Sequence, residues 1–270
     1  MLACRLCTEE GKPARAVTSL AGKIYVLRDK AQDQVEVYDV NTYRLQHCLA
    51  MPNISVFTDI TSCEHYLCLY IGDHNAECVH RLDVQGAATG WPVNDNPQGL
   101  SVNAAHNVIV TCRTVCKIKE FSSHGVLLRE LALPGDFTNP WHTIQTRSGQ
   151  LIVCDGKIGA PFHGVRMLSD DGHHTLQSHG GKAGPDTGQY KVPTHLSFDD
   201  NEFVFVADLY NCRVALLSPT LRYVRHVASR DQLEGSPRSL YFDSERRFLY
   251  VAVNAPTDAI WKGRVLVFRV

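Results

Sequence analysis

The sequence lacks a long hydrophobic run and has no excess of charge of either sign. It contains 27 Lys and Arg against 28 Asp and Glu, which gives a formal net charge of −1 over 270 residues. The longest apolar run, residues 66–71, has the length of a strand, whereas a membrane-spanning helix needs about 20 residues. Hydrophobic residues make up 44% and charged residues 20%, as in an ordinary globular chain. Disorder, a membrane-spanning helix and a globally basic nucleic-acid binder are therefore disfavoured, although a neutral total still permits a local basic patch.

Cysteine is too scarce for a domain held together by disulfides. The chain has 10 Cys, well below the roughly 8–10% of a disulfide scaffold. Cys68, Cys112 and Cys154 lie within apolar runs, where a free thiol packs as a small hydrophobic group. The first ten residues have no apolar core and no small-residue cleavage site, so no signal peptide is predicted. We therefore expect a reduced protein of the cytoplasm that has no membrane partner.

Metal-binding spacing is also sparse near the N-terminus. Cys4-x-x-Cys7 has the spacing of half a structural zinc site. A structural site needs four ligands, and no second Cys-x-x-Cys or His pair accompanies this one. The sequence therefore predicts no structural metal here.

An internal repeat organises the whole chain. Prolines 13, 97, 140, 193 and 237 each open a similar pattern, with a β-rich run centred thirteen residues later, and Val56 fills the missing register. The predicted units are 13–55, 56–96, 97–139, 140–192, 193–236 and 237–270. The fourth unit is the longest and contains the glycine-rich stretch 180–185, which indicates a loop insertion.

Each unit contains four short β-rich segments separated by turn residues. In the fifth unit these segments are 194–198, 202–207, 213–217 and 221–227. Four strands in about 40–45 residues are typical of a propeller blade. The sequence therefore predicts an all-β, six-bladed β-propeller that occupies residues 1–270 as one domain. The last unit has only three segments, and residues 2–8 are predicted to complete it as an N-terminal latch strand that closes the ring.

The fifth unit also carries a recognisable motif. Pro193-x-x-Leu196-x-Phe198-Asp199, followed by Val206-Ala207-Asp208-x-x-Asn211-x-Arg213-Val214, resembles the NHL repeat. That repeat builds six-bladed propellers at the C-terminus of many tripartite-motif proteins, which also contain a RING, a B-box and a coiled coil. The other units match the motif less fully, and the first two match only its periodicity.

The polar residues of this motif are expected to be structural. Asp208 is predicted to accept backbone N–H groups of the turn, and Asn211 to occupy a left-handed turn position. Arg213 is predicted to pair with a carboxylate of the same or the next blade.

A binding surface is predicted on one face of the propeller. Propeller function usually lies on the face built by the loops that enter each innermost strand and those that link the second and third strands. In these loops Trp, Tyr and Arg, the residues that dominate binding hot spots, occur together with further cations and histidines. The predicted binding face consists of Arg15, Arg113, Trp141, His142, Lys157, Phe162, His163, His195, Tyr210, Arg238, Trp261 and Lys262.

Two histidines of this set could begin a metal site. His142 and His195 both lie two residues after an anchor proline in adjacent units, so their side chains should point the same way. The residues expected at that register in the other units are Arg15, Thr58, Gly99 and Ser239. None of these completes a three-ligand site, so we predict hydrogen-bonded histidines with no metal and no cofactor.

These patterns favour a non-catalytic binding propeller that recognises a protein partner and is a monomer as an isolated domain. The resemblance to tripartite-motif proteins implies substrate recruitment in a ubiquitin-ligase context. Single-stranded RNA binding on the same face is an alternative, which Asp73, Glu77 and Asp155 in these loops disfavour. A second alternative is a metal-dependent lactonase or lyase with its centre in the channel.

Overall fold

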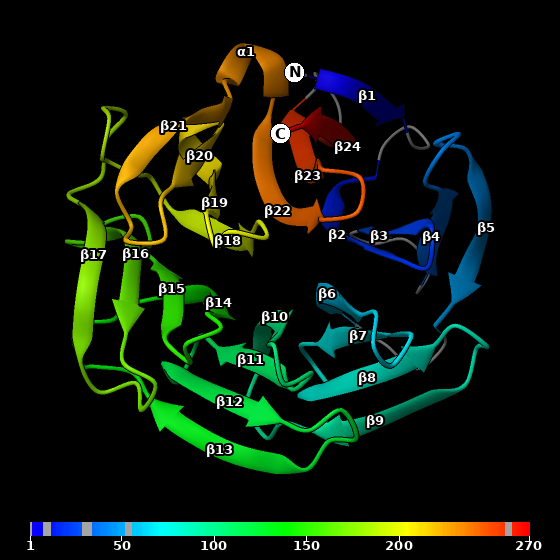
Figure 1. Ribbon diagram of the computed structural model, residues 1–270, viewed down its shortest axis with the longest axis horizontal. Helices are drawn as coiled ribbons and strands as arrows, with labels where there is room; N and C mark the ends of the chain where they lie inside the picture. The colour runs from blue at the N-terminus through cyan, green and yellow to red at the C-terminus, as the bar shows by residue number, and fades with distance from the viewer. Residues whose placement is uncertain (1, 8–11, 29–33, 52–55, 257–260) are drawn as a thin grey trace.

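The chain forms a ring of six four-stranded antiparallel sheets (Figure 1). The computed structural model describes residues 2–7, 12–28, 34–51, 56–256 and 261–270. Five sheets take four consecutive strands each, and the sixth has the order β1-β24-β23-β22. The predicted all-β, six-bladed propeller is therefore confirmed. None of the helices in the described ranges is long and apolar enough to cross a membrane.

The strands occupy four concentric positions. The innermost strands are β2 (Ala14–Leu20), β6 (Phe57–Cys63), β10 (Pro97–Val102), β14 (Pro140–Gln145), β18 (Pro193–Phe198) and β22 (Ser236–Asp243). The second strands are β3 (Lys23–Arg28), β7 (Cys68–Asp73), β11 (Val108–Cys112), β15 (Leu151–Asp155), β19 (Val204–Asp208) and β23 (Phe248–Pro256). The third strands are β4 (Gln34–Asp39), β8 (Cys78–Asp83), β12 (Lys117–Phe121), β16 (His163–Leu168), β20 (Arg213–Leu217) and β24 (Trp261–Arg269). The outer strands are β5 (Leu45–Ala50), β9 (Ala88–Pro92), β13 (Leu127–Ala132), β17 (Thr175–Gly181), β21 (Tyr223–Ala228) and β1 (Leu2–Cys7).

Two short helical turns interrupt this pattern. The 3₁₀ turn η1 (Leu209–Asn211) links β19 to β20, and the single-turn helix α1 (Arg230–Leu233) precedes β22. Both lie in connections, so the blades themselves are built entirely of strands.

The last blade combines strands from both ends of the chain. β1 pairs antiparallel with β24, from Leu2 opposite Phe268 to Cys7 opposite Arg264. Residue 8, the end of the predicted latch, lies outside the described residues. The role of this pairing in holding the ring closed stays a prediction.

The hydrophobic core lies between neighbouring blades. Second strands such as β11, β15 and β19 are buried along their whole length, and each begins with three or four consecutive apolar residues for this reason. Outer strands such as β5 and β13 are mostly exposed. Cys68, Cys112 and Cys154 are fully buried free thiols, as predicted.

Polar side chains of the innermost strands tie each blade to a neighbour. The Ser101 hydroxyl donates to the backbone oxygen of Thr143 in the next blade, at 2.7 Å. The Phe242 amide donates to the Ser197 hydroxyl at 3.1 Å, again across a blade boundary. Because a buried backbone group without a partner is costly, these bonds set the stagger of adjacent blades.

Gly99 in β10 provides a test of how closely the inner strands pack. A Cβ atom at this position would lie 2.5 Å from the Trp141 backbone oxygen and 3.0 Å from the Cα atom of His142. We expect Gly99→Ala to lower the free energy of unfolding by about 1–3 kcal/mol, because neither backbone atom can move alone. Urea denaturation measures this change. Gly135→Ala is the matched control because its Cβ atom would meet nothing within 4 Å, and equal stabilities of the two variants would contradict the prediction.

Candidate functional site

A bulge at the start of each innermost strand organises the centre of the propeller. In β14, Pro140 lies opposite Asp155 and His142 lies opposite Cys154, so Trp141 is an extra residue. The same shift occurs near the start of every innermost strand. The bulge turns the extra residue toward the mouth of the channel. We call these six residues the mouth ring: Arg15, Thr58, Gln98, Trp141, Thr194 and Arg238.

The residue that follows each bulge forms a second ring, deeper in the channel. Strand pairing assigns this ring to Ala16, Gly99, His142, His195 and Ser239. In the second blade Asp59 belongs to it, because its carboxylate contacts both histidines. The sequence-based register is therefore wrong by one residue in the first two blades, where Arg15 and Thr58 were expected beside the histidines. The pairs Ala14–Arg28 and Phe57–Asp73 correspond to the pair Pro140–Asp155. Because Phe57 replaces proline in the second blade, the anchor was displaced and Asp59 was missed.

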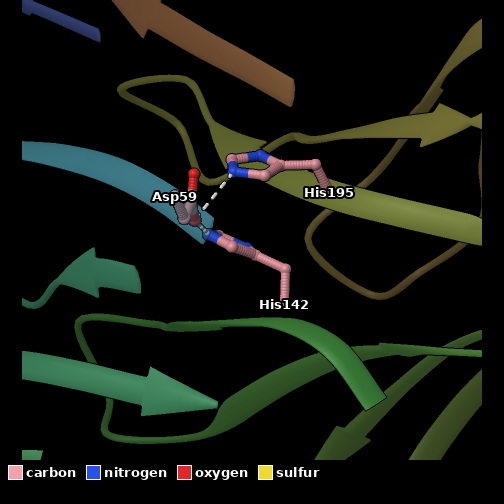
Figure 2. Close-up of side chains that lie close together, drawn as sticks. All are labelled: Asp59, His142 and His195. Carbon is pink, nitrogen blue, oxygen red and sulfur yellow. Dashed lines mark ion pairs between the residues drawn. The ribbon is translucent and has the colours of Figure 1, made fainter. Parts of the chain in front are cut away.

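Asp59, His142 and His195 meet in the second ring (Figure 2). The Oδ2 atom of Asp59 lies 3.4 Å from Nε2 of His195 and 3.6 Å from Nε2 of His142. The two imidazole rings stack with centroids 3.7 Å apart and planes inclined by 28°. All three side chains are buried. The histidines were predicted on the loop face, and the structure places them beneath it.

Backbone groups of neighbouring blades hold this cluster. His142 Nε2 donates to the Leu100 oxygen at 2.9 Å, and the Leu100 amide donates to Asp59 Oδ2 at 2.8 Å. His195 Nδ1 accepts from the Leu240 amide at 3.3 Å, so its proton lies on Nε2, which faces Asp59. These contacts involve residues of five blades, and the histidines are hydrogen-bonded as predicted.

Burial controls the charges in the cluster. Desolvation, followed by the charge of His195, lowers the pKa of His142 to about 3, so its ring stays neutral. Burial by itself raises the pKa of Asp59, but the charge and hydrogen bond of His195, together with the Leu100 amide, lower it overall. Asp59 is therefore the resident anion of the channel.

The same cluster offers three metal-ligand atoms, which corrects the prediction that no third ligand is present. The three atoms lie within 4.8 Å of one another. The separations from Asp59 match the roughly 3.3 Å expected between ligands of a tetrahedral zinc ion with bonds of about 2.0–2.1 Å. In the present arrangement, however, both Nε2 atoms carry protons, because His142 Nε2 donates to the Leu100 oxygen and His195 Nδ1 accepts from the Leu240 amide. A shared ion would therefore require these protons to be displaced. We call Asp59, His142 and His195, as held here by hydrogen bonds, the channel plug.

The plug lies between two hollows. The mouth ring surrounds a small depression, and His195 also lines a channel cavity of about 300 Å³ beyond it. That cavity is lined by hydroxyls, imidazoles and aliphatic groups from all six innermost strands. A ligand that approaches the mouth therefore meets the arginine and tryptophan side chains before the buried cluster.

Arginines gather around Trp141 at the mouth. The Arg113 guanidinium lies 4.4 Å from the Trp141 ring centroid, and that of Arg238 lies 6.0 Å from it. The Trp141 indole donates to the Gly156 oxygen at 2.9 Å, which fixes the ring. Arg15 donates to the Thr58 oxygen at 3.2 Å. We call Arg15, Arg113, Trp141 and Arg238 the arginine–tryptophan cluster.

The other residues of the predicted binding face have different environments. Lys157 and Tyr210 are exposed. Phe162 is half-buried beneath the Arg166 guanidinium, which lies 4.1 Å from its ring centroid. His163 is buried and accepts from the Val192 amide at 3.1 Å, so its expected place on the surface is wrong. The backbone of Trp261 and Lys262 belongs to β24, and their side chains lie outside the described residues.

The motif residues of the fifth blade form one buried network. Arg213 Nε donates to Asp208 Oδ2 at 2.8 Å, and Asn211 Nδ2 donates to the same oxygen at 2.7 Å. The Lys191 amide donates to Asp208 Oδ1. The left-handed turn position belongs to Cys212, with φ of 53°, and not to Asn211, which lies within η1.

Known proteins resemble this chain in fold. No protein-family model and no curated protein matches the sequence. A streptogramin B lyase structure superposes with a TM-score of 0.67 at 10% identity, covering 98% of this chain and 86% of the lyase chain. Hydrazine synthase from Kuenenia stuttgartiensis gives 0.66 at 12% identity with 97% of each chain covered, and U3-55K gives 0.70 at 10% with 98% of each covered. These likenesses show the propeller fold, which occurs in enzymes and does not assign a function.

The neutral state of His142 predicts a pH-dependent stability. The unfolded chain binds a proton at His142 near pH 6.5, whereas the folded chain binds it only near pH 3. The free energy of unfolding should therefore fall as the pH falls between these values, with His142 contributing up to about 1.4 kcal/mol per pH unit. Urea denaturation at several pH values should show a shallower decline for His142→Gln. His173→Gln, at an exposed histidine, should follow the wild-type curve, and a wild-type slope in His142→Gln would contradict the prediction.

Proposed function

We propose that the protein is a non-catalytic binding propeller that recognises an acidic group of a protein partner at the channel mouth. The observation that carries the proposal is the arginine–tryptophan cluster, in which Arg113 and Arg238 flank one indole ring. A guanidinium stacked on an aromatic ring points its N–H donors outward in its own plane, a geometry that suits a carboxylate. The rigid ring holds these donors in place, so binding costs little ordering entropy.

Repulsion between neighbouring arginines favours the binding of an anion at this site. Burial, followed by the charge of Arg15, lowers the pKa of the Arg113 guanidinium. The structure therefore holds two like charges close together in partly desolvated surroundings. A guest carboxylate would relieve that repulsion while it accepts hydrogen bonds.

The distribution of charge favours a protein over RNA. Lys119 and Arg166 of the third and fourth blades are held in ion pairs, with Asp95 at 2.7 Å and with Asp136 at 2.9 Å. The arginine–tryptophan cluster is a compact cationic patch that suits a single acidic group, whereas single-stranded RNA needs a continuous basic groove. Asp73 and Asp155 do not oppose RNA at the surface, as the sequence suggested, because both are fully buried.

The cellular setting of this proposal comes from the sequence resemblance alone. The NHL-like motif of residues 193–214 supports a cytoplasmic propeller related to those of tripartite-motif proteins. On that basis the partner is a substrate recruited in a ubiquitin-ligase context, and the isolated domain is a monomer.

The mouth can be tested with two probes of equal charge, an oligoglutamate peptide and oligouridine. We expect the peptide to bind and Arg113→Ala or Arg238→Ala to weaken it about tenfold, or about 1.4 kcal/mol. Fluorescence anisotropy at several salt concentrations measures both affinities. Arg222→Ala is the charge-matched control, because this exposed arginine lies in a loop at the opposite end of its blade.

Two outcomes would overturn the proposal. Tighter binding of oligouridine, lost in the same two variants, would assign the mouth to RNA. Equal binding of the peptide by Arg113→Ala, Arg238→Ala and Arg222→Ala would show that the peptide does not bind at the mouth.

A second candidate is a metal-dependent lactonase or lyase, which the convergence of Asp59 with His142 and His195 favours. An ion held there would activate water for hydrolysis. This candidate predicts turnover of a lactone probe with an added divalent ion, measured by pH-stat titration, and its loss in Asp59→Asn. Lys157→Ala is the control, and the absence of turnover with zinc, manganese and calcium ions would exclude this lactonase activity.

A further inference from the structure

A carboxylate, a thiol and an imidazole meet in the second blade, away from the channel plug. Asp73 ends β7 and lies directly opposite Cys78, the first residue of β8. His80 follows two residues later, so its side chain lies on the same face of β8 as that of Cys78. The Cys78 Sγ atom is 3.1 Å from His80 Nε2, and that nitrogen is 3.7 Å from Asp73 Oδ2.

Two other blades place a buried ion pair at this strand junction. In the fifth blade, the equivalent opposite residues are Asp208 and Arg213, which form an ion pair at 2.8 Å. In the first blade the charges are exchanged, and Arg28 pairs with Glu36 at 2.8 Å.

The second blade has the same strand pairing at this junction but carries different side chains there. Cys78 takes the position of the fifth blade's arginine. His80 takes the position that Arg166 holds in the fourth blade, two residues after the residue opposite Asp155. Both positions where other blades carry a guanidinium thus carry a metal-ligating side chain beside a buried carboxylate.

The cluster is buried on the side of its carboxylate and open to solvent on the side of its thiol and imidazole. Asp73 is fully buried, while Cys78 and His80 are half-buried, with 19% of the His80 side chain exposed. Gly90 lies opposite His80 in β9, and a Cβ atom there would be 3.3 Å from His80 Nδ1. The glycine therefore lets the imidazole lie against the strand.

We propose that Asp73, Cys78 and His80 form a zinc site. The three ligand atoms lie within 4.8 Å of one another. Ligands of a tetrahedral zinc ion, with bonds of about 2.0–2.3 Å, are roughly 3.3–3.6 Å apart, close to the observed 3.1 and 3.7 Å. A thiolate combined with an imidazole selects zinc over magnesium or calcium, and the exposed side leaves a position for water.

Backbone amides of the loop that follows β7 orient the carboxylate for this role. Asp73 Oδ1 accepts from the amides of Asn75 and Ala76, at 3.1 and 3.3 Å. These bonds fix the carboxylate so that Oδ2 faces the imidazole. An ion here would also hold the loop of residues 74–77, which lies on the same face of the propeller as the mouth.

Cobalt(II) provides the decisive probe because a thiolate ligand has its own spectral signature. We expect one equivalent of cobalt to give a thiolate-to-cobalt charge-transfer band in the near ultraviolet, which zinc then removes by displacement. Cys78→Ser should abolish the band, and His80→Ala should weaken cobalt binding at least tenfold. Circular dichroism of the metal-free variants checks that they are folded.

Control variants separate this site from the other sulfur and nitrogen ligands. The band should persist in Cys116→Ser, which changes another half-buried cysteine, and in the double variant Cys4→Ser/Cys7→Ser. It should also persist in His142→Ala/His195→Ala, because the channel plug has no thiol. A band that survives Cys78→Ser, or no saturable binding at one equivalent per chain, would overturn the proposal. None of these outcomes depends on what binds at the mouth.

Discussion

The architecture depends on hydrogen bonds that pass from inner-strand side chains to the backbone of a neighbouring blade. Each innermost strand has only one partner strand in its own sheet, so its other backbone groups face the channel and the next blade. Asp59 bonding to the Leu100 amide and His195 to the Leu240 amide satisfy these groups, as the inner serines do elsewhere. The same bonds fix the stagger of the blades, and they thereby fix the positions of the mouth residues.

The bulge at the start of every inner strand determines which side chain lies at the mouth of the channel. One extra residue per blade is turned toward the mouth, while the next residue remains in the second ring. Trp141 and His142 are therefore adjacent in sequence but lie in different layers: the first belongs to the mouth ring, and the second is buried with Asp59. Under the proposed function, this arrangement separates binding at the mouth from stability in the plug. At 10–12% identity the shared fold does not assign a function, so the proposed function rests on these side chains.

The junction between the second and third strands shows how one geometry accepts different chemistry. Arg28–Glu36 and Asp208–Arg213 satisfy the same demand with opposite polarity, because a buried charge needs a close partner of the other sign. The two ion pairs use different sequence positions, so no single sequence motif marks this junction in every blade. In the second blade, the same constraint has produced the cluster of Asp73, Cys78 and His80.

The sequence by itself determined the six blades, the four strands in each and the burial of Cys68, Cys112 and Cys154, because apolar alternation and turn residues are local signals. Only the tertiary structure decided that Asp59 joins His142 and His195, that His163 is buried, and that Arg113 and Arg238 meet at Trp141. In the blades anchored on prolines 97, 140, 193 and 237 the register was correct. In the first two blades, where Ala14 and Phe57 hold the anchor position, the register was off by one residue. The physical reason is that a bulge is defined by the residue across the strand pair, and a channel is defined by six strands that are distant in sequence.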